Sequence, residues 1–142
     1  MDMLHQASCV AIGADSNARA IMIEGQPGAG KSSLALALID RGAQLIGDDG
    51  VQLTVRDGRL IAAPPPRISG MMEIRNVGLI TMPVTSAPVG LIISLDPEAP
   101  RFIDQAEQAE RLGCMIPLIR LWPDSPVLHL RAEQALLRYG IN

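Results

Sequence analysis

Aromatic residues are nearly absent from this chain: they make up 2% of its 142 residues, as one Phe, one Trp and one Tyr. An aliphatic core is therefore expected, and a surface on which nucleic-acid bases stack is not. Positive charge is also scarce, because 12 Lys and Arg stand against 15 Asp and Glu and the formal net charge is −3. Surfaces that bind nucleic acid are usually strongly basic, so the composition argues against a nucleic-acid partner.

Cysteine is equally sparse. Cys9 and Cys114 are too few for a disulfide framework or a metal cluster, and we expect free thiols in a cytoplasmic protein. Residues 1–17 have no basic start and only a short apolar run, unlike a secretory signal. No apolar run is long enough to span a bilayer, so no membrane contact is expected. The hydrophobic share of 48% and charged share of 19% are typical of one globular domain.

The pattern along the chain predicts an α/β domain. The Ala- and Leu-rich segment 32–42 favours a helix that stops at Gly42. Asp57-Gly58 lies in the middle of an alternating segment and indicates a hairpin turn. Helices are also predicted at 104–113 and 125–140. Strands are predicted as a hairpin of 8–13 with 20–25, at 44–49, on both arms of 51–63, at 71–83, at 89–96, and as a Pro-containing edge strand at 115–123.

Residues 25–38, GQPGAGKSSLALAL, contain the phosphate-binding pattern G-x-x-x-x-G-K-[ST] between a predicted strand and a predicted helix. Glycines let backbone amides approach phosphate oxygens, and the helix that follows directs its positive dipole end at the anion. Lys31 offers a charge to the β- and γ-phosphates, and Ser32 offers a hydroxyl to Mg²⁺. The predicted nucleotide-binding residues are Gly25, Gln26, Pro27, Gly28, Ala29, Gly30, Lys31, Ser32 and Ser33.

A magnesium–nucleotide site also needs carboxylates, which commonly follow a buried strand. Asp96 ends the apolar run LIISL, but Pro97 follows it, so a plain Asp-Pro turn is the alternative. Asp48 and Asp49 end the run LIG as an adjacent pair. Neighbouring carboxylates repel unless a cation is near, so one could bind Mg²⁺ while the other accepts a proton from a hydroxyl nucleophile. A solvated acidic turn is the alternative for this pair.

The run from Gly25 to Asp49 resembles the catalytic domain of HPr kinase/phosphorylase. Residues 63–80, APPPRISGMMEIRNVGLI, resemble the signature of that family, and 4–13 and 109–113 support the likeness. The resemblance implies one catalytic P-loop domain over 1–142, without the N-terminal regulatory domain, as in short alphaproteobacterial forms. It implies a fold of the phosphoenolpyruvate carboxykinase-like type, with a mixed β-sheet core and flanking helices.

The resemblance also implies a serine protein kinase that uses ATP and Mg²⁺ to phosphorylate HPr, the phosphocarrier of the phosphotransferase system. Asp49 matches the proton acceptor of that reaction. The implied catalytic residues are His5, Lys31, Asp49 and Arg111. The implied magnesium ligands are Ser32 and Glu73, to which the paired-carboxylate argument adds Asp48. The implied signature strand carries Glu73, Arg75 and Gly78.

Three of these assignments have plainer alternatives. His5 could be a solvated residue near a terminus, and Arg111 could lie on the solvated face of a polar helix. Glu73 and Arg75 could form an exposed ion pair on one face of a strand, which would contribute little stability.

Several positions depart from the family pattern. Gln26, Pro27, Ser33 and Asn76 replace usual family residues, the mobile loop between 77 and 91 is mostly missing, and the Gly-Arg segment linked to dephosphorylation is not clear. These losses leave the phosphorolysis of phosphoserine-HPr, metabolite control and the family's homo-hexamer without support, while the kinase residues stay in place. A small-molecule P-loop kinase and a nucleotide-binding regulator without catalysis remain the rival interpretations.

Overall fold

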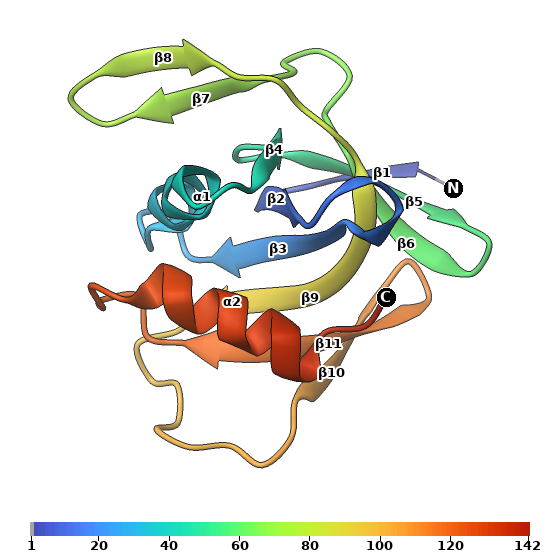
Figure 1. The fold of residues 1–142 in the computed structure, drawn as a ribbon, viewed down its shortest axis with the longest axis vertical. Coiled ribbons are helices and arrows are strands. Elements are labelled where there is room, and N and C mark those ends of the chain that lie inside the picture. Colours follow the sequence, from blue (N-terminus) through green and yellow to red (C-terminus); the bar gives the residue numbers. More distant parts are fainter. Residues whose placement is uncertain (1) are drawn as a thin grey trace.

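The computed structural model describes residues 2–142 and shows a strongly curved mixed β-sheet with two α-helices packed on one side (Figure 1). This is the α/β architecture that the sequence predicts. The helices are α1 (Lys31–Asp40) and α2 (Leu128–Tyr139), with a short 3-10 turn at Asp15–Asn17. The strands are β1 (Asp2–His5), β2 (Ser8–Ile12), β3 (Arg19–Gly25), β4 (Gln44–Gly47), β5 (Val51–Arg56), β6 (Arg59–Ala63), β7 (Met71–Ile74), β8 (Gly78–Thr81), β9 (Ala87–Leu95), β10 (Glu107–Arg111) and β11 (Cys114–Leu121).

The long strand β9 joins two parts of the sheet. Strand order runs β1-β5-β6-β9-β3-β2-β4, and β11 and β10 branch from β9. The beginning of β9 pairs with β6 antiparallel, at Ala87 and Pro88, whereas its second half pairs with β3 and β11 in parallel. Because β9 belongs to both parts of the curved sheet, the β1-β5-β6 layer packs against one face of the central strands β2, β3 and β9. β3, whose end leads into the phosphate loop, is therefore an inner strand of the sheet, between β9 and β2.

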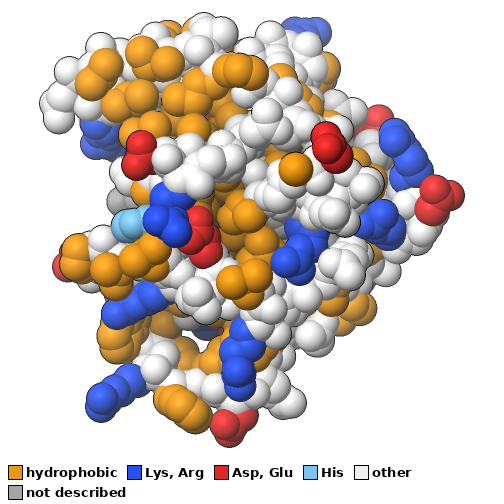
Figure 2. All heavy atoms as spheres, viewed as in Figure 1, with side chains coloured by type: hydrophobic (Ala, Val, Ile, Leu, Met, Phe, Trp, Pro, Cys, Tyr) orange, Lys and Arg blue, Asp and Glu red, His pale blue; other side chains and the backbone are white. Residues whose placement is uncertain are grey.

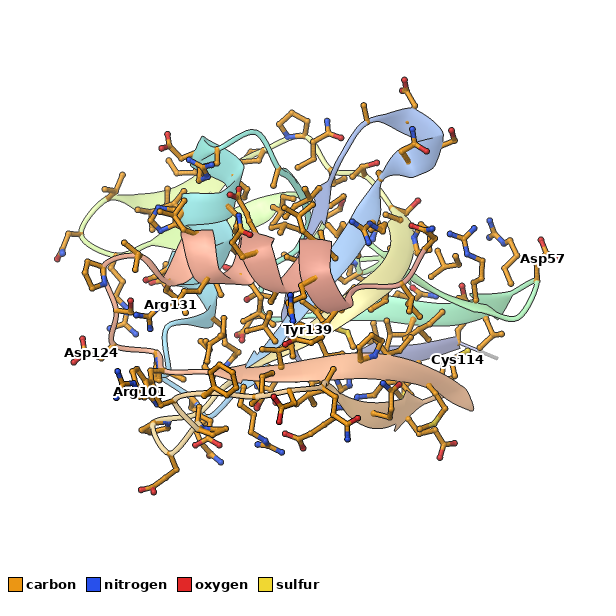
Figure 3. The ribbon with its side chains drawn as sticks, turned by 60° about the horizontal axis from the view of Figure 1, so that its bottom comes forward. Asp57, Arg101, Cys114, Asp124, Arg131 and Tyr139 are labelled. Carbon is orange, nitrogen blue, oxygen red and sulfur yellow. The ribbon has the colours of Figure 1, made fainter. Side chains whose placement is uncertain are left out.

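Two apolar clusters hold these layers together. Side chains alternate across β3, so Ile21 and Ile23 face the helices, where they meet Leu34 and Leu38 of α1. Met22 faces the opposite way and packs in a second cluster with the β5-β6 layer. α2 crosses the strands beside α1, with Arg131 in its first half and Tyr139 at its end (Figure 3). Both sides of the central strands are thus buried, which makes β2 and β3 rigid supports for the loops at their ends.

Most of the predicted elements are confirmed. β2 and β3 form the expected hairpin, β5 and β6 form the second one with Asp57 at its tip (Figure 3), and α1 is followed by Gly42. Cys9 and Cys114 are free thiols, as expected, and burial raises the pKa of the Cys9 thiol. Within residues 2–142 no helix is long and apolar enough to cross a membrane.

Two predictions near the C-terminus are wrong. Residues 104–113 contain β10 rather than a helix, because Leu112 and Gly113 adopt positive φ and turn the chain into a hairpin with β11. Tertiary pairing overrides the helix propensity of Gln, Glu and Ala there. β11 is not an edge strand, since β10 and β9 flank it. Pro117 is tolerated because the pairing with β9 begins only at Leu118.

The predicted signature strand is also a hairpin. Glu73 lies on β7, Arg75 lies in the turn after it, and Gly78 begins β8. Asn76 adopts φ 70° in that turn, a left-handed conformation that Asn tolerates better than most residues. The two strands form a separate small sheet that stands beside α1 and away from the main sheet (Figure 1).

Candidate active site

The phosphate loop connects the end of β3 to the start of α1. Gly28 and Gly30 adopt φ 81° and 104°, values that suit glycine and turn the loop's backbone. The Nζ of Lys31 donates hydrogen bonds of 3.1 Å to the carbonyl oxygens of Gly25 and Gln26. The Lys31 side chain therefore folds back across the loop, and the residue is only 8% exposed. This arrangement places its positive charge inside the loop that a phosphate would enter.

The tandem aspartates follow β4, and Asp48 reaches the first turn of α1. Its Oδ1 accepts a 2.7 Å hydrogen bond from the hydroxyl of Ser32 and a 2.9 Å bond from the hydroxyl of Ser8. Ser8 is fully buried on β2. The backbone N–H of Asp49 donates to the same Ser8 oxygen at 3.4 Å. Ser8 and Ser32 thus fix the Asp48 carboxylate from two different elements.

The turn that bears the two aspartates is tight. Asp49 adopts φ 65°, a left-handed conformation that costs about 1–2 kcal/mol for a residue other than glycine. Gly47 has no room for a side chain, because a Cβ there would collide with the carbonyl oxygen of Gly50. The strained turn directs Asp48 inward and leaves Asp49 exposed, so the two neighbouring carboxylates occupy different environments.

A cavity of about 1100 Å³ lies between the phosphate loop, the aspartates and the β7–β8 hairpin. Asp96, the other strand-end acid, does not line this cavity, and its carboxylate accepts bonds from Arg120 Nη1 at 3.3 Å and from the backbone N–H of Glu98 at 2.8 Å. These contacts agree with the plain Asp-Pro turn that was the alternative for Asp96. The predicted site residues that line the cavity are Pro27, Gly28, Gly30, Lys31, Ser32, Ser33, Asp48, Asp49, Glu73 and Arg75.

The β7–β8 hairpin forms an apolar wall of the cavity that also carries two charged residues, Glu73 and Arg75. Hydrophobic side chains gather over it (Figure 2), and Met71 and Leu79 line the cavity although they are 38% and 66% exposed. Glu73 is cross-strand to Leu79 and also lines the cavity. Arg75 lies in the turn after β7 rather than on the strand, and no ion pair joins it to Glu73 among residues 2–142, so the structure does not contain the same-face pair of the plainer interpretation.

His5 and Arg111 meet at Glu24, the residue directly before the loop. His5 Nε2 lies 2.7 Å from Glu24 Oε2, and Arg111 donates to both carboxylate oxygens, from Nη2 at 2.6 Å and from Nε at 3.1 Å. An ionised carboxylate only accepts, so Nε2 of His5 bears the proton. Burial alone would raise the pKa of Glu24, but the hydrogen bonds from His5 and Arg111 outweigh burial and hold that pKa below its usual value.

This cluster lies on the far side of the sheet from α1. Glu24 shares a face of β3 with Met22, the face that looks toward the β5-β6 layer. None of His5, Glu24 and Arg111 lines the cavity. The structure therefore brings the two predicted catalytic residues together beneath the loop but does not bring them onto the cavity wall. Neither residue is simply solvated, because their side chains are 23% and 22% exposed.

Sequence reasoning missed Ser8 and Glu24. Each is a polar residue at the end of an apolar strand, and that position was the available signal. Their partners come from strands and loops 19 to 87 residues away in the sequence, so only the folded topology identifies them.

The fold and the loop define the class of this protein: it is an α/β P-loop domain with paired acids at the loop. A model of the family described as "HPr Serine kinase C-terminal domain" matches residues 8–86, more than half of the chain. The chain belongs to that family.

Relatives and a solved structure agree with this assignment. HPr kinase/phosphorylase of Clostridium tetani is 46% identical over 63 residues, which cover 44% of this chain and 21% of that protein. HPr kinase/phosphorylase of Clostridium kluyveri is 38% identical over 84 residues, 54% of this chain and 27% of that protein. The chain thus matches about a fifth to a quarter of the length of these curated relatives. The HPr(Ser) kinase/phosphatase structure from Coxiella burnetii superposes with a TM-score of 0.78 at 30% identity, covering 96% of this chain and 88% of the other.

Proposed function

We propose that this chain is an ATP-dependent serine protein kinase that phosphorylates HPr, the phosphocarrier of the phosphotransferase system. Membership of the family supports the substrate. The observation that supports the chemistry best is the 2.7 Å hydrogen bond from Ser32 to Asp48, which joins the phosphate loop to the paired acids within one cavity. We further propose that residues 1–142 act as a single catalytic domain.

The nucleotide would be held by residues 25–33. The loop's amides and the N-terminus of α1 offer partial positive charge to the phosphates. Lys31 already lies across this loop, where its ammonium would exchange carbonyl oxygens for the β- and γ-phosphate oxygens. The same loop explains why a phosphate ligand suits a domain whose net charge is negative, because the binding charge is local.

The residues present fit a magnesium ion. Mg²⁺ prefers oxygen ligands in an octahedral arrangement, keeps several waters and usually takes one or two carboxylates besides substrate phosphates. Ser32, Asp48 and Glu73 supply such oxygens around the cavity. Within residues 2–142, no group of three or more His, Cys, Asp and Glu could hold a metal ion alone, so the nucleotide phosphates would have to supply further ligands. Bound Mg²⁺ would neutralise charge on the transferring phosphoryl group.

Asp49 is the proposed proton acceptor. The serine oxygen of HPr would attack the γ-phosphorus in line, the bond from that phosphorus to the β,γ-bridging oxygen would break, and ADP would leave. The serine proton would pass to the Asp49 carboxylate, which is exposed at the cavity and can be reached by a protein side chain. Asp48, held by the hydroxyls of Ser8 and Ser32, would face the metal.

His5 and Arg111 would act on this site from the face of the sheet that lies away from α1. Both are tied to Glu24, whose backbone continues directly into Gly25 and the loop. We propose that the three side chains together hold the start of the loop in place, so that His5 and Arg111 act on the reaction through Glu24. This proposal gives His5 and Arg111 a role in the reaction although neither lines the cavity.

One labelling experiment separates the proposal from its rivals. The protein is incubated with γ-³²P-ATP, Mg²⁺ and HPr, and in parallel with an HPr preparation whose serines have been replaced by alanine. Label on wild-type HPr, recovered as phosphoserine and absent from the serine-free protein, supports the kinase. Nucleotide binding without transfer supports a regulator, and transfer to a small hydroxyl compound alone supports a small-molecule kinase, for which Arg75 in the cavity is the favouring feature. Addition of phosphate to labelled product tests phosphorolysis.

A further inference from the structure

Two polar or charged residues are buried among residues 2–142, and only one of them has been assigned a part in the proposed reaction. They are Lys31 and Ser8. Lys31 belongs to the phosphate loop, whereas Ser8 lies on β2, a strand flanked on both sides by β3 and β4. A buried hydroxyl needs hydrogen-bond partners, and a small apolar residue would fill the same place without that need. The partners of Ser8 therefore indicate what the hydroxyl is for.

Both partners belong to the tandem aspartates. The Ser8 hydroxyl uses its one proton for Asp48 Oδ1 at 2.9 Å, and its oxygen accepts the backbone N–H of Asp49 at 3.4 Å. No second backbone or side-chain contact within the described chain competes for that proton. A single side chain thus contacts both members of the acidic pair, and it does so from a fully buried position on β2, between β3 and β4.

Ser8 and Ser32 hold Asp48 in different ways. Ser32 belongs to the first turn of α1, and its hydroxyl is itself a proposed metal ligand. Its geometry must adjust when metal and nucleotide bind. Ser8 faces no such change, because it is enclosed in the sheet and does not line the cavity. The bond from Ser8 therefore provides the fixed reference for the carboxylate, as second-layer donors do at other metal sites.

We propose that Ser8 is a positioning residue that orients Asp48 for Mg²⁺ and holds the strained turn that presents Asp49. The inference rests on the proposed function only in giving Asp48 a role at the metal; it does not depend on which hydroxyl accepts the phosphate. Ser8 touches neither nucleotide nor acceptor, so its effect should appear in metal affinity while binding of the metal-free nucleotide is retained.

The test measures metal and nucleotide binding separately. Mn²⁺ serves as the probe, with its affinity for the protein–AMP-PNP complex followed by electron paramagnetic resonance. Fluorescent MANT-ATP reports nucleotide affinity in EDTA. Ser8→Ala and Ser8→Cys are the variants, the second keeping the shape of the side chain with a larger sulfur atom and only a weak donor. We expect both to weaken Mn²⁺ binding by about 10-fold or more, with MANT-ATP affinity in EDTA within about twofold of wild type.

Two controls separate positioning from a general loss of stability. Cys9→Ala alters the fully buried residue next to Ser8, whose side chain packs in the apolar cluster with the β5-β6 layer. Ser16→Ala removes an exposed serine hydroxyl far from the aspartates in the sequence. Both should keep wild-type Mn²⁺ affinity even where Cys9→Ala lowers the melting temperature. Wild-type Mn²⁺ affinity in Ser8→Ala and Ser8→Cys, or an equal loss in Cys9→Ala, would overturn the inference. A wild-type protein that binds Mn²⁺ and nucleotide but never labels HPr would overturn the proposed kinase and leave this inference standing.

Discussion

The hydroxyl of Ser32 donates a 2.7 Å hydrogen bond to Asp48, so the first turn of α1 and the end of β4 meet at one carboxylate oxygen. The two residues come from segments with separate predicted roles, a phosphate loop and an acidic pair. Their contact places both roles in one cavity, together with Lys31 and Asp49. Substitutions of these residues should therefore have different effects, because each residue is proposed to act in a different step of the reaction.

Asp49→Asn should slow phosphate transfer by orders of magnitude while nucleotide still binds. An amide has nearly the shape of the carboxylate but cannot accept the serine proton, and the loss of a general base typically costs 10²- to 10⁴-fold in rate. The measurement is kcat for HPr phosphorylation beside the Kd for MANT-ATP. Asp57→Asn, an exposed aspartate at the tip of the β5–β6 hairpin, is the matched control and should leave both unchanged. Undiminished transfer by Asp49→Asn would show that another group is the base.

Asp48→Asn should act on the metal rather than on the proton. The amide of this variant would keep an oxygen near Ser32 but lose the charge that favours Mg²⁺. We expect the Mg²⁺ concentration for half-maximal activity to rise by about 10-fold or more, with part of kcat recovered at high Mg²⁺. A Mg²⁺ titration of phosphorylation measures this. The same half-saturating concentration as wild type, with a lower kcat throughout, would contradict a metal role for Asp48.

Glu24→Gln should destabilise the fold in a pH-dependent way. The folded pKa of Glu24 lies below its unfolded value, because the hydrogen bonds and charges of His5 and Arg111 outweigh burial. A depressed pKa contributes stability above the unfolded pKa, and that contribution disappears as the pH falls through the folded pKa. Glu24→Gln should therefore lose about 1–3 kcal/mol near pH 7, the worth of hydrogen bonds to charged groups, and approach wild type in strongly acidic solution.

Urea unfolding of wild type and Glu24→Gln from pH 7 down through the carboxyl range tests that expectation. Glu133→Gln is the control, because Glu133 pairs with Arg41 at the surface and such pairs contribute about 0–1 kcal/mol. A stability difference between wild type and Glu24→Gln that stays constant down to the lowest pH would show that the Glu24 carboxylate charge is not what stabilises the cluster.

Leu38→Ala should cost about 2–5 kcal/mol, because Leu38 is fully buried where α1 packs on the central strands and its removal leaves a cavity. Leu137→Ala on α2 removes the same atoms from a residue that is 69% exposed and should change stability by about 0.5 kcal/mol or less. Urea unfolding compares the two variants. Equal losses would contradict the packing of α1 as the support of the phosphate loop.

The sequence predicts those parts of the fold whose signals are local. The phosphate loop, the two β-hairpins around it and both helices follow from glycine spacing, alternation and propensity, and the structure contains them. The strand β10 is not predicted because its composition favours a helix, while the turn at Leu112-Gly113 and the pairing with β11 decide its conformation. The β7–β8 hairpin replaces a single predicted strand, because one Asn turn inside an apolar run is a weak signal.

The site residues also divide into those with a local sequence signal and those that only the folded chain brings together. Lys31, Ser32 and the tandem aspartates could be placed from motif and resemblance because each lies at the end of a predicted element. Glu24 could not be placed as a partner, because His5 comes from β1 and Arg111 from β10, strands that reach it only through the curvature of the sheet.

We propose that the lysine-bearing loop and the tandem aspartates converge on one metal-bound triphosphate. Crystals grown with AMP-PNP and Mn²⁺ test this arrangement, since anomalous scattering locates the manganese. We predict one strong peak within about 2–2.5 Å of the Ser32 hydroxyl oxygen, on the cavity side next to Asp48, with the γ-phosphate beside Lys31. A peak away from both residues, or phosphates bound outside the loop of residues 25–33, would contradict it.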